Sequence, residues 1–194
     1  MKLAELLRLD RTIKVIGFDD APFSRTSSSL VSIAGVVCGG TRFEGMVWGQ
    51  VLSDGLDATD VICQLLLGGK FLPQLHLVLL DGIAFGGFNI IDLPKLASLL
   101  QIPCVAVMRR QPDLAAVEKA LGHFSDSEYR LELLRRAGKI YAFEPFFFQV
   151  CGEQPEVIAL VLQRLTDTGK VPEALRLAHL IGAAVITGVS GSSA

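Results

Sequence analysis

The stretch HLVLLDGIAFGGFN, residues 76–89, decides how the rest of the sequence is interpreted. Its apolar first half, with the leucine before it, predicts an interior strand over 75–80, and the glycine-rich half predicts a loop. Asp81 stands at the junction. A carboxylate at the end of an apolar strand either caps the turn that follows or holds a metal ion or a proton.

Composition limits the class of protein. The chain has 194 residues, 51% of them hydrophobic and 20% charged, which predicts one well-packed domain over 1–194. The net charge of −2 provides no overall field that attracts nucleic acid, so a role on nucleic acid needs a local patch and a divalent cation. The apolar runs are too short to cross a bilayer and no signal-peptide pattern opens the chain, so we expect no membrane association.

The cysteines indicate a reducing compartment. Cys38, Cys63, Cys104 and Cys151 are scattered, mostly among apolar neighbours, and none forms a C-x-x-C motif. Buried free thiols fit this pattern better than disulfides or a zinc site. We therefore expect a cytoplasmic protein.

The first part of the chain predicts three antiparallel strands and a helix. IKVIGFDD (13–20) is rich in β-formers and ends in two aspartates. Two more strand-like runs, 27–40 and 41–52, are joined through a Gly-Gly pair, which is a hairpin signal. The segment 56–70 has a helical pattern, with Asp57 placed to cap it and two glycines at its end.

From residue 75 onward the pattern changes to strands that alternate with helices. The predicted strands are 75–81, 102–110 and the β-type run 139–150, and the predicted helices are 92–101, 112–122, 125–138, 154–169 and 171–185. Because crossovers between parallel strands are right-handed, strand 75–81 should lie parallel to the first strand and beside it. We therefore expect an α/β fold with a mixed five-stranded sheet, three antiparallel strands followed by parallel βα units, flanked by helices. That order is similar to the ribonuclease H-like fold.

The ends of the first and fourth strands predict a site. Ligands of such sheets lie beyond the carboxyl ends of the strands, and these strands end in Asp19-Asp20 and in Asp81. Neighbouring strands are about 4.8 Å apart and magnesium–oxygen bonds are about 2.1 Å, so two carboxylates there can share one cation. Asp19 and Asp20 point to opposite faces of a strand, so we expect only one of them to join Asp81 and the other to serve the turn.

Other residues leave two interpretations open. Asp60 lies in the first turn of a helix, where a carboxylate commonly offsets the helix dipole. Arg109 closes the fifth strand on the same rim as the aspartates, either as a solvated charge or as a partner for a phosphate. The glycines of DGIAFGGFN match no dinucleotide or P-loop motif, but they let a backbone approach a ligand closely. His179 falls on an apolar helix face and is predicted to be a core or surface residue.

Three segments together resemble endonuclease V relatives of the endonuclease dU-like kind. They are KVIGFDD (14–20), LVLLDGIAFGGFNIIDLPKLASLLQIPCVAV (77–107) and VPEALRLAH (171–179), and the likeness runs from the first strand to the final helix. The resemblance implies a ribonuclease H-like fold and a metal-dependent cut in nucleic acid near a deaminated base. Mg²⁺ or Mn²⁺ would be the cofactor, and DNA that is damaged or single-stranded would be the partner.

The resemblance also implies residues for the site. It places the metal ligands at Asp19 and Asp81 and, by spacing, at Asp60, and it places a phosphate-binding cation at Arg109. The loop of the fourth strand would then form the pocket for an extruded base, with Gly82, Gly86, Gly87, Phe88 and Asn89 as its lining.

The chain departs from that family in ways that keep other functions open. MVWGQ (46–50) stands where endonuclease V has an aromatic-proline wedge, and no clear equivalent of the later GHR motif is found. One alternative is a module that binds nucleic acid or protein without catalysis on the same fold. The other is a hydrolase of a small phosphorylated metabolite. The sequence leaves base specificity, metal count and oligomeric state open.

Overall fold

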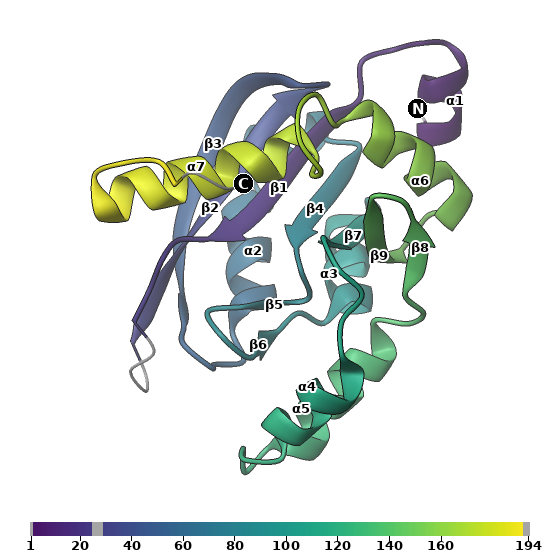
Figure 1. Ribbon diagram of the computed structural model, residues 1–194. Helices are drawn as coiled ribbons and strands as arrows, with labels where there is room; N and C mark the ends of the chain where they lie inside the picture. The colour runs from purple at the N-terminus through teal and green to yellow at the C-terminus, as the bar shows by residue number, and fades with distance from the viewer. Residues whose placement is uncertain (1, 25–28, 192–194) are drawn as a thin grey trace.

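The computed structural model describes residues 2–24 and 29–191 (Figure 1). The strands are β1 (Lys14–Asp20), β2 (Leu30–Gly39), β3 (Arg42–Leu52), β4 (Leu77–Asp81), β5 (Ala84–Phe85), β6 (Asn89–Ile90), β7 (Cys104–Met108), β8 (Tyr141–Phe143) and β9 (Phe146–Cys151). The helices are α1 (Leu3–Arg8), α2 (Ala58–Leu66), α3 (Leu93–Leu100), α4 (Leu114–Leu121), α5 (Ser127–Arg136), α6 (Pro155–Arg164) and α7 (Glu173–Thr187), with a 3₁₀ turn, η1 (Leu72–Gln74), before β4. Residues 27 and 28 of the second predicted strand lie outside the described residues.

One mixed sheet has the strand order β3-β2-β1-β4-β7-β9-β8. The predicted antiparallel pairing of the first three strands is confirmed, since β2 pairs antiparallel with both β1 and β3. The predicted parallel neighbours are confirmed too, because Val15 to Phe18 of β1 pair in register with Leu77 to Leu80 of β4. β7 then lies parallel on the other side of β4. The α/β fold expected from the sequence is therefore the observed one.

The predicted count of five strands is too low. The run 139–150 was expected as a single β-type segment, but it forms the hairpin β8–β9 around Glu144-Pro145, and β9 adds antiparallel to β7. The loop predicted after Asp81 also carries a short hairpin, β5–β6. The main sheet of the described residues thus has seven strands.

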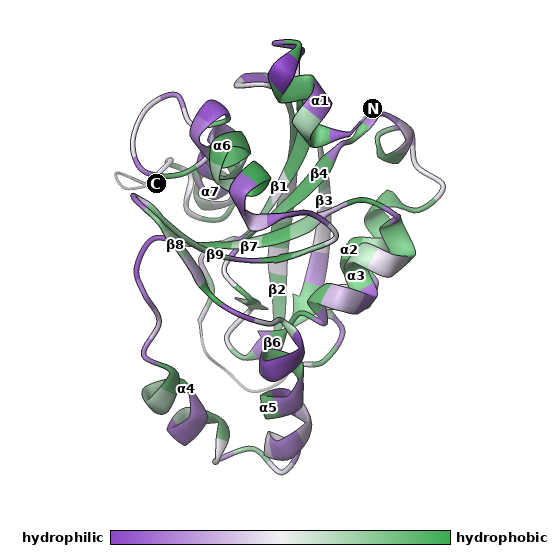
Figure 2. Ribbon diagram, turned by 90° about the vertical axis from the view of Figure 1, so that its right-hand side faces the viewer, coloured by the Kyte–Doolittle hydropathy of each residue, from purple (hydrophilic) through white to green (hydrophobic). Residues whose placement is uncertain are grey.

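Helices cover both faces of the sheet. The central strands, which lie between the two helical layers, are mainly hydrophobic (Figure 2). Along β1 the side chains alternate: Val15 packs in the cluster under α1, α6 and α7, whereas Ile16 and Phe18 pack in the cluster under α2 and α3. The same alternation directs Asp19 toward the α7 face and Asp20 toward the α2–α3 face. No helix in the described part of the chain is long and apolar enough to span a membrane.

Helix α7 lies unusually close to β1 because Gly17 has no side chain. A Cβ atom at Gly17 would come within 2.8 Å of the backbone of Ala174 and Leu175. Further along the helix, a Cβ at Gly182 would lie 3.2 Å from Cα of Ala21. The helix and the strand therefore run side by side from Gly17 to just beyond the end of β1, with His179 between these two contacts.

Helices α4 and α5 lie together at one end of the molecule, beyond the carboxyl ends of the parallel strands (Figure 1). Arg130 of α5, only 4% exposed, ties this end to the sheet. Its guanidinium donates to the carbonyl oxygens of Asp54, Gly55 and Phe88 at 2.8, 3.0 and 2.6 Å, and it pairs with Asp126. The loop after β4 is thereby held against the end of β3.

Candidate active site

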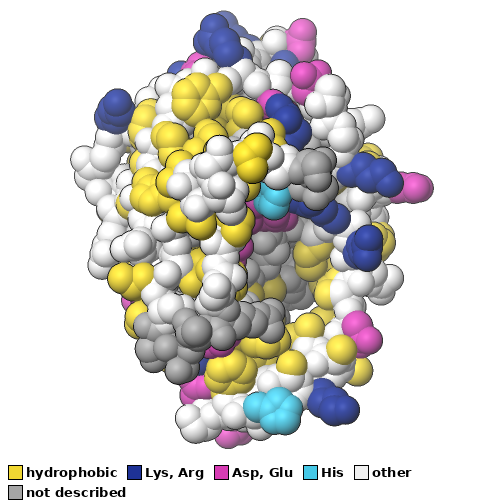
Figure 3. Space-filling model, turned by 60° about the vertical axis from the view of Figure 1, so that its left-hand side comes forward, with side chains coloured by type: hydrophobic (Ala, Val, Ile, Leu, Met, Phe, Trp, Pro, Cys, Tyr) yellow, Lys and Arg dark blue, Asp and Glu magenta, His cyan; other side chains and the backbone are white. Residues whose placement is uncertain are grey.

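A cavity of about 720 Å³ opens beyond the carboxyl ends of β1, β4 and β7. It is lined by Asp19, Asp20, Ala21, Pro22, Phe23, Asp81, Gly82, Ala84, Val107, Met108, Arg109 and His179. In Figure 3 the surface is hollowed near the centre, with acidic atoms and a histidine at the upper rim of the hollow and hydrophobic side chains beside and below it. Strand order reverses beside β1, which is where α/β sheets commonly bind ligands.

The two aspartates at the end of β1 both line the cavity but have different partners. Oδ2 of Asp19 lies 2.9 Å from Nδ1 of His179 on α7. Oδ2 of Asp20 accepts a hydrogen bond of 2.7 Å from the backbone N–H of Gly86. Both carboxylates reach the cavity because it lies beyond the strand end, but a hydrogen bond joins Asp19 to Asp81 whereas Asp20 holds the loop after β4.

Asp81 and Arg109 face each other across neighbouring strand ends. Asp81 pairs with Val107 in the β4–β7 register, and Nη2 of Arg109 lies 3.3 Å from Oδ2 of Asp81. Asp20, rather than Asp81, accepts the N–H of Gly86 and so binds the loop after β4. Asp81 thus has Asp19 and the partly exposed Arg109 as side-chain partners, and a ligand can replace the 3.3 Å contact with Arg109.

Burial and mutual repulsion perturb the three carboxyl groups. Burial, the largest cause, raises the pKa of Asp19 from 3.8 to about 8, and the charges of Asp81 and Asp20 act in the same direction. Burial also raises the pKa of Asp20 and of Asp81; for Asp81 the charges of Arg109 and His179 and a hydrogen bond with Asp19 oppose that rise. The cavity therefore disfavours ionisation of all three carboxyl groups at once.

His179 belongs to this site, although the sequence pattern predicted a core or surface residue. It lies 160 positions after Asp19, and the apolar residues around it on α7 gave no sign of a polar partner. The close contact of α7 with Gly17 places it over the end of β1. A glycine in a buried strand, matched by small residues on a later helix, is the sequence signal that could have indicated this contact.

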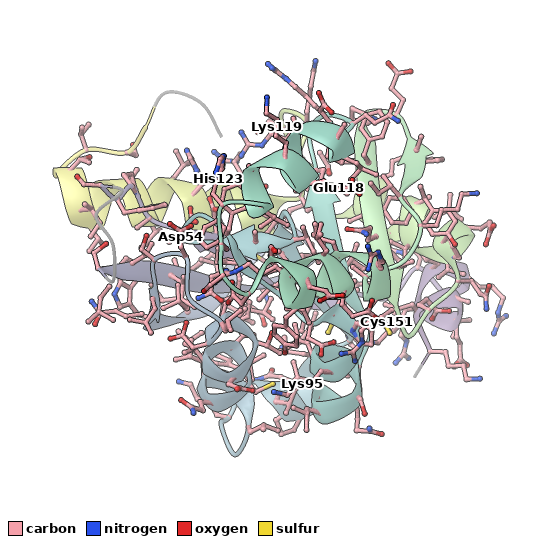
Figure 4. The ribbon with its side chains drawn as sticks, turned by 90° about the horizontal axis from the view of Figure 1, so that it is seen from below. Asp54, Lys95, Glu118, Lys119, His123 and Cys151 are labelled. Atoms are coloured by element: carbon pink, nitrogen blue, oxygen red, sulfur yellow. The ribbon has the colours of Figure 1, made fainter. Side chains whose placement is uncertain are left out.

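Asp60 is not brought to the cavity. It lies in the first turn of α2, its side chain is 55% exposed, and Oδ1 is 2.6 Å from Nζ of Lys95 on α3. Figure 4 shows Lys95 on the α2–α3 side of the molecule, away from α7. The aspartate in the first turn of this helix thus has a local ionic partner, and the structure separates it from Asp19 and Asp81.

The residues expected to line a base pocket are also divided. Gly82 lines the cavity. Asn89 is fully buried and its side chain binds the backbone N–H of Ala58 at 3.0 Å and the carbonyl of Leu52, also at 3.0 Å. Its role in the structure is to join the start of α2 to the end of β3.

The three residues before Asn89 are held by the same network. Asp54 donates its backbone N–H to the carbonyl of Gly86 and accepts the N–H of Phe88 on Oδ1. A Cβ at Gly87, where φ is +98°, would collide with the Asp54 carboxylate. Gly86, Gly87 and Phe88 therefore fix the loop whose amide binds Asp20, and they do not line the cavity.

The chemistry of the donor set suits a hard divalent cation. Carboxylate oxygens are the ligands that Mg²⁺ and Mn²⁺ prefer. Among the described residues no group of three or more His, Cys, Asp or Glu is placed to hold an ion. Mg²⁺ is commonly bound by one or two carboxylates, water and the phosphates of a substrate, so Asp19 and Asp81 meet that requirement.

The fold is similar to that of solved endonuclease V structures. Endonuclease V of Ciona intestinalis, solved in complex with a 24mer DNA containing an inosine followed by a ribo-adenosine, is similar over 88% of this chain and 84% of its own. The TM-score is 0.55 and the sequence identity 20%, a likeness that shows the shared ribonuclease H-like fold.

The chain belongs to the Endonuclease dU family, which matches residues 11–186. A UPF0215 protein of Methanothermobacter thermautotrophicus is 37% identical over 187 residues, covering 94% of this chain and 92% of the relative. A protein of unknown function from Archaeoglobus fulgidus has a crystal structure with a TM-score of 0.85 and 31% identity, covering 91% of this chain and 99% of the other. The resemblance stated from the sequence is thus confirmed at the level of family and fold.

Proposed function

We propose that the protein is a divalent-metal-dependent nuclease that hydrolyses a phosphodiester bond in the cavity beyond β1, β4 and β7. The observation that carries the proposal is the gathering of three carboxylates, Asp19, Asp20 and Asp81, with Arg109 and His179 in one cavity. A phosphodiester is an anion, and so many carboxylates can receive it only with a cation between them.

Asp19 and Asp81 would hold Mg²⁺ or Mn²⁺. A divalent ion would stabilise the ionised form of these buried carboxyl groups, and the oxygen donors match the preference of such ions. The bound ion would supply Lewis-acid stabilisation of the phosphate and a water molecule of lowered pKa. Asp20 would hold the loop after β4 in place through Gly86 while adding negative charge to the site.

Arg109 would bind the phosphate. Its side chain is 36% exposed and only 3.3 Å from Asp81, a contact that an incoming phosphate oxygen can replace with a stronger one. It would then neutralise charge that develops on the phosphate during in-line attack. Because a phosphate contact positions the strand without reading its sequence, Arg109 would not select the base.

His179 would act as a general acid or base. Nδ1 is bound to Asp19, which fixes the orientation of the ring and leaves Nε2 to exchange a proton with a water molecule or with the leaving oxygen. This pair thus links a metal ligand to an acid–base group.

Nucleic acid with a deaminated or damaged base, such as deoxyuridine or deoxyinosine, is the proposed substrate. The family is described as Endonuclease dU, and the endonuclease V with the same fold was solved with inosine-containing DNA. Extrusion of a nucleotide costs least at a mismatched or damaged base, which favours such sites over intact duplex.

The test is the cutting of a labelled oligonucleotide that carries one deoxyuridine or one deoxyinosine, single- and double-stranded, with Mn²⁺ or Mg²⁺ at low salt. We expect the wild type to cut these substrates, Asp81→Asn to abolish cutting, and Arg109→Ala to slow it without changing which base is chosen. Asp10→Asn is the matched control, because Asp10 is 95% exposed, has φ of +51° that asparagine accepts, and pairs with Arg164.

Several results would contradict the proposal. Equal cutting by wild type and Asp81→Asn would identify a contaminating nuclease. Hydrolysis of a small phosphate ester with no cutting of any oligonucleotide would favour the metabolite hydrolase, and binding without hydrolysis would favour the binding module. Asp60→Asn is tested separately. If the variant still cuts, Asp60 serves only its ion pair with Lys95; if cutting is lost, Asp60 takes part in the reaction.

A further inference from the structure

Half of the cavity is lined by apolar side chains, which would contact neither the phosphate nor the metal ion. Its polar side is formed by the carboxylates, Arg109 and His179. The other lining residues carry apolar side chains: Ala21, Pro22, Phe23, Ala84, Val107 and Met108. A phosphate group and a metal ion need only the polar side, so the apolar side implies an occupant that also has an apolar face.

Phe23 and Met108 come from the two strands that flank β4. Phe23 follows β1, three residues after Asp20, and Met108 is the last residue of β7; the strand order places β4 between these two strands. Phe23 is the only aromatic side chain among the described residues that line the cavity, and it is partly buried against the core under α2 and α3. A flat group that enters the cavity can thus contact both an aromatic ring and a thioether.

The cavity floor beside Asp81 is open backbone. Gly82 follows Asp81 with φ of +86°, and a Cβ built there would have no atom within 4 Å. Its backbone N–H donates to the carbonyl of Val107 at 2.8 Å, which fixes the floor relative to β7. A planar ligand can therefore lie over Gly82 without displacing a side chain.

We propose that Phe23 and Met108 form a base-binding wall that takes one unstacked nucleobase of the strand whose phosphate lies at the carboxylates. The inference rests on the proposed function and names the substrate group that the apolar half receives. Aromatic rings bind nucleobases by stacking, largely without regard to sequence, and thioether sulfur makes favourable contacts with aromatic rings. Selection of the base would then come from the cost of unstacking it, with the wall holding any base that leaves the stack.

The size and the chemistry of the cavity favour a nucleotide over a smaller phosphate ester. About 720 Å³ is within the usual range of ligand pockets and leaves room beyond a phosphate group. An inorganic phosphate or a short aliphatic phosphate would leave Phe23 and Met108 in contact with water.

The experiment measures binding, so it does not depend on cutting. Fluorescence anisotropy with Mn²⁺ compares a single-stranded oligonucleotide with a chain of the same length and charge from which all bases are removed. Both are titrated into otherwise wild-type protein, with and without Phe23→Ala, and gel electrophoresis checks that each chain stays intact during the titration. Removal of a stacking ring weakens binding by about 5- to 150-fold per base. We expect Phe23→Ala to weaken binding of the oligonucleotide within that range and to leave binding of the base-free chain unchanged.

Two further variants separate stacking from packing. Phe23→Leu keeps apolar volume against the core and removes the flat ring, so it should melt like the parent and bind the oligonucleotide as weakly as Phe23→Ala. Phe23→Trp should restore binding. Phe43→Ala, at a phenylalanine that is 49% exposed on the edge strand β3, is the matched control and should change neither affinity.

If Phe23→Ala weakened binding of the oligonucleotide and of the base-free chain equally, the base-binding wall would be refuted, because Phe23 would then act through the fold. An unchanged affinity for the oligonucleotide in Phe23→Leu would overturn it as well. Failure of the proposed function is a separate result, since it would appear as absence of cutting in wild-type protein whatever Phe23 does to binding.

Discussion

Asp19→Asn should stabilise the metal-free protein. Asp19 is 6% exposed and is surrounded by Asp20 and Asp81, so its charged form is disfavoured in the folded state. Asparagine has nearly the same shape and no charge, and it can still hydrogen-bond His179. The substitution removes the repulsion and the desolvation cost without opening a cavity.

The magnitude follows from the pKa of Asp19. A carboxyl whose pKa is 3.8 in the unfolded chain and about 8 in the folded protein binds its proton more tightly when folded. Its contribution to stability is therefore complete below pH 3.8 and is lost as the pH rises through 8. At pH 7 the loss is about 4 kcal/mol and at pH 5 it is about 2 kcal/mol, by proton linkage. Asp19→Asn has no such loss.

The assay is urea unfolding in EDTA at a series of pH values between 4 and 9. We expect the free energy of unfolding of Asp19→Asn to exceed that of the wild type by an amount that increases with pH and becomes constant above pH 8. Asp10→Asn, at an exposed aspartate, should show no such increase. Addition of Mn²⁺ should narrow the difference, because only the wild type gains binding energy.

A difference between Asp19→Asn and wild type that does not change with pH would refute the reasoning, since the ionisation of Asp19 would then carry no cost. A variant less stable than the wild type at pH 7 would refute it as well. That result would mean that the contact between Asp19 and His179 outweighs burial and repulsion.

Three other changes test the packing that forms the site. Gly17→Ala should lower the free energy of unfolding by about 1–3 kcal/mol, because its Cβ would meet the α7 backbone at 2.8 Å, and an unchanged urea midpoint would contradict that contact. Arg130→Ala should cost about 3–5 kcal/mol, since it leaves three carbonyl oxygens without a donor, whereas Arg135→Ala at a 67% exposed arginine of the same helix should change stability by less than about 0.5 kcal/mol. Millimolar Mn²⁺ should raise the melting temperature of the wild type and leave that of Asp81→Asn unchanged; an unmoved wild-type melt would argue against a metal site.

The sequence by itself determined the architecture around residues 76–89. The apolar run before Asp81 predicted a buried strand, and the order of hairpin first and βα units later placed that strand beside β1. Strand ends that meet at one edge then predicted that Asp19, Asp81 and Arg109 would gather, and the cavity contains all three. These features depend on local periodicity and on chain order, which are visible along the sequence.

The sequence missed features that depend on how elements pack. The run 139–150 has uniform β character, so the hairpin β8–β9 became evident only where β9 pairs with β7. Asp60 stands in the first turn of its helix, where the family resemblance places a metal-ligating residue. Only the packing of α2 against α3 shows that its carboxylate pairs with Lys95 instead. Phe23 follows Asp20 by three residues, but no sequence pattern gave it a role in the site. Its place in the cavity follows from the path of the chain after β1.

His179 shows most directly what tertiary structure decided. Helical periodicity identifies a face of α7 that packs inward, but it does not say which residue of that face lies over which residue of β1. That alignment is set by the absence of a side chain at Gly17, where the helix backbone touches the strand and brings His179 within 2.9 Å of Asp19. Contacts between residues 160 positions apart depend on steric fit between surfaces, and only the folded chain provides it.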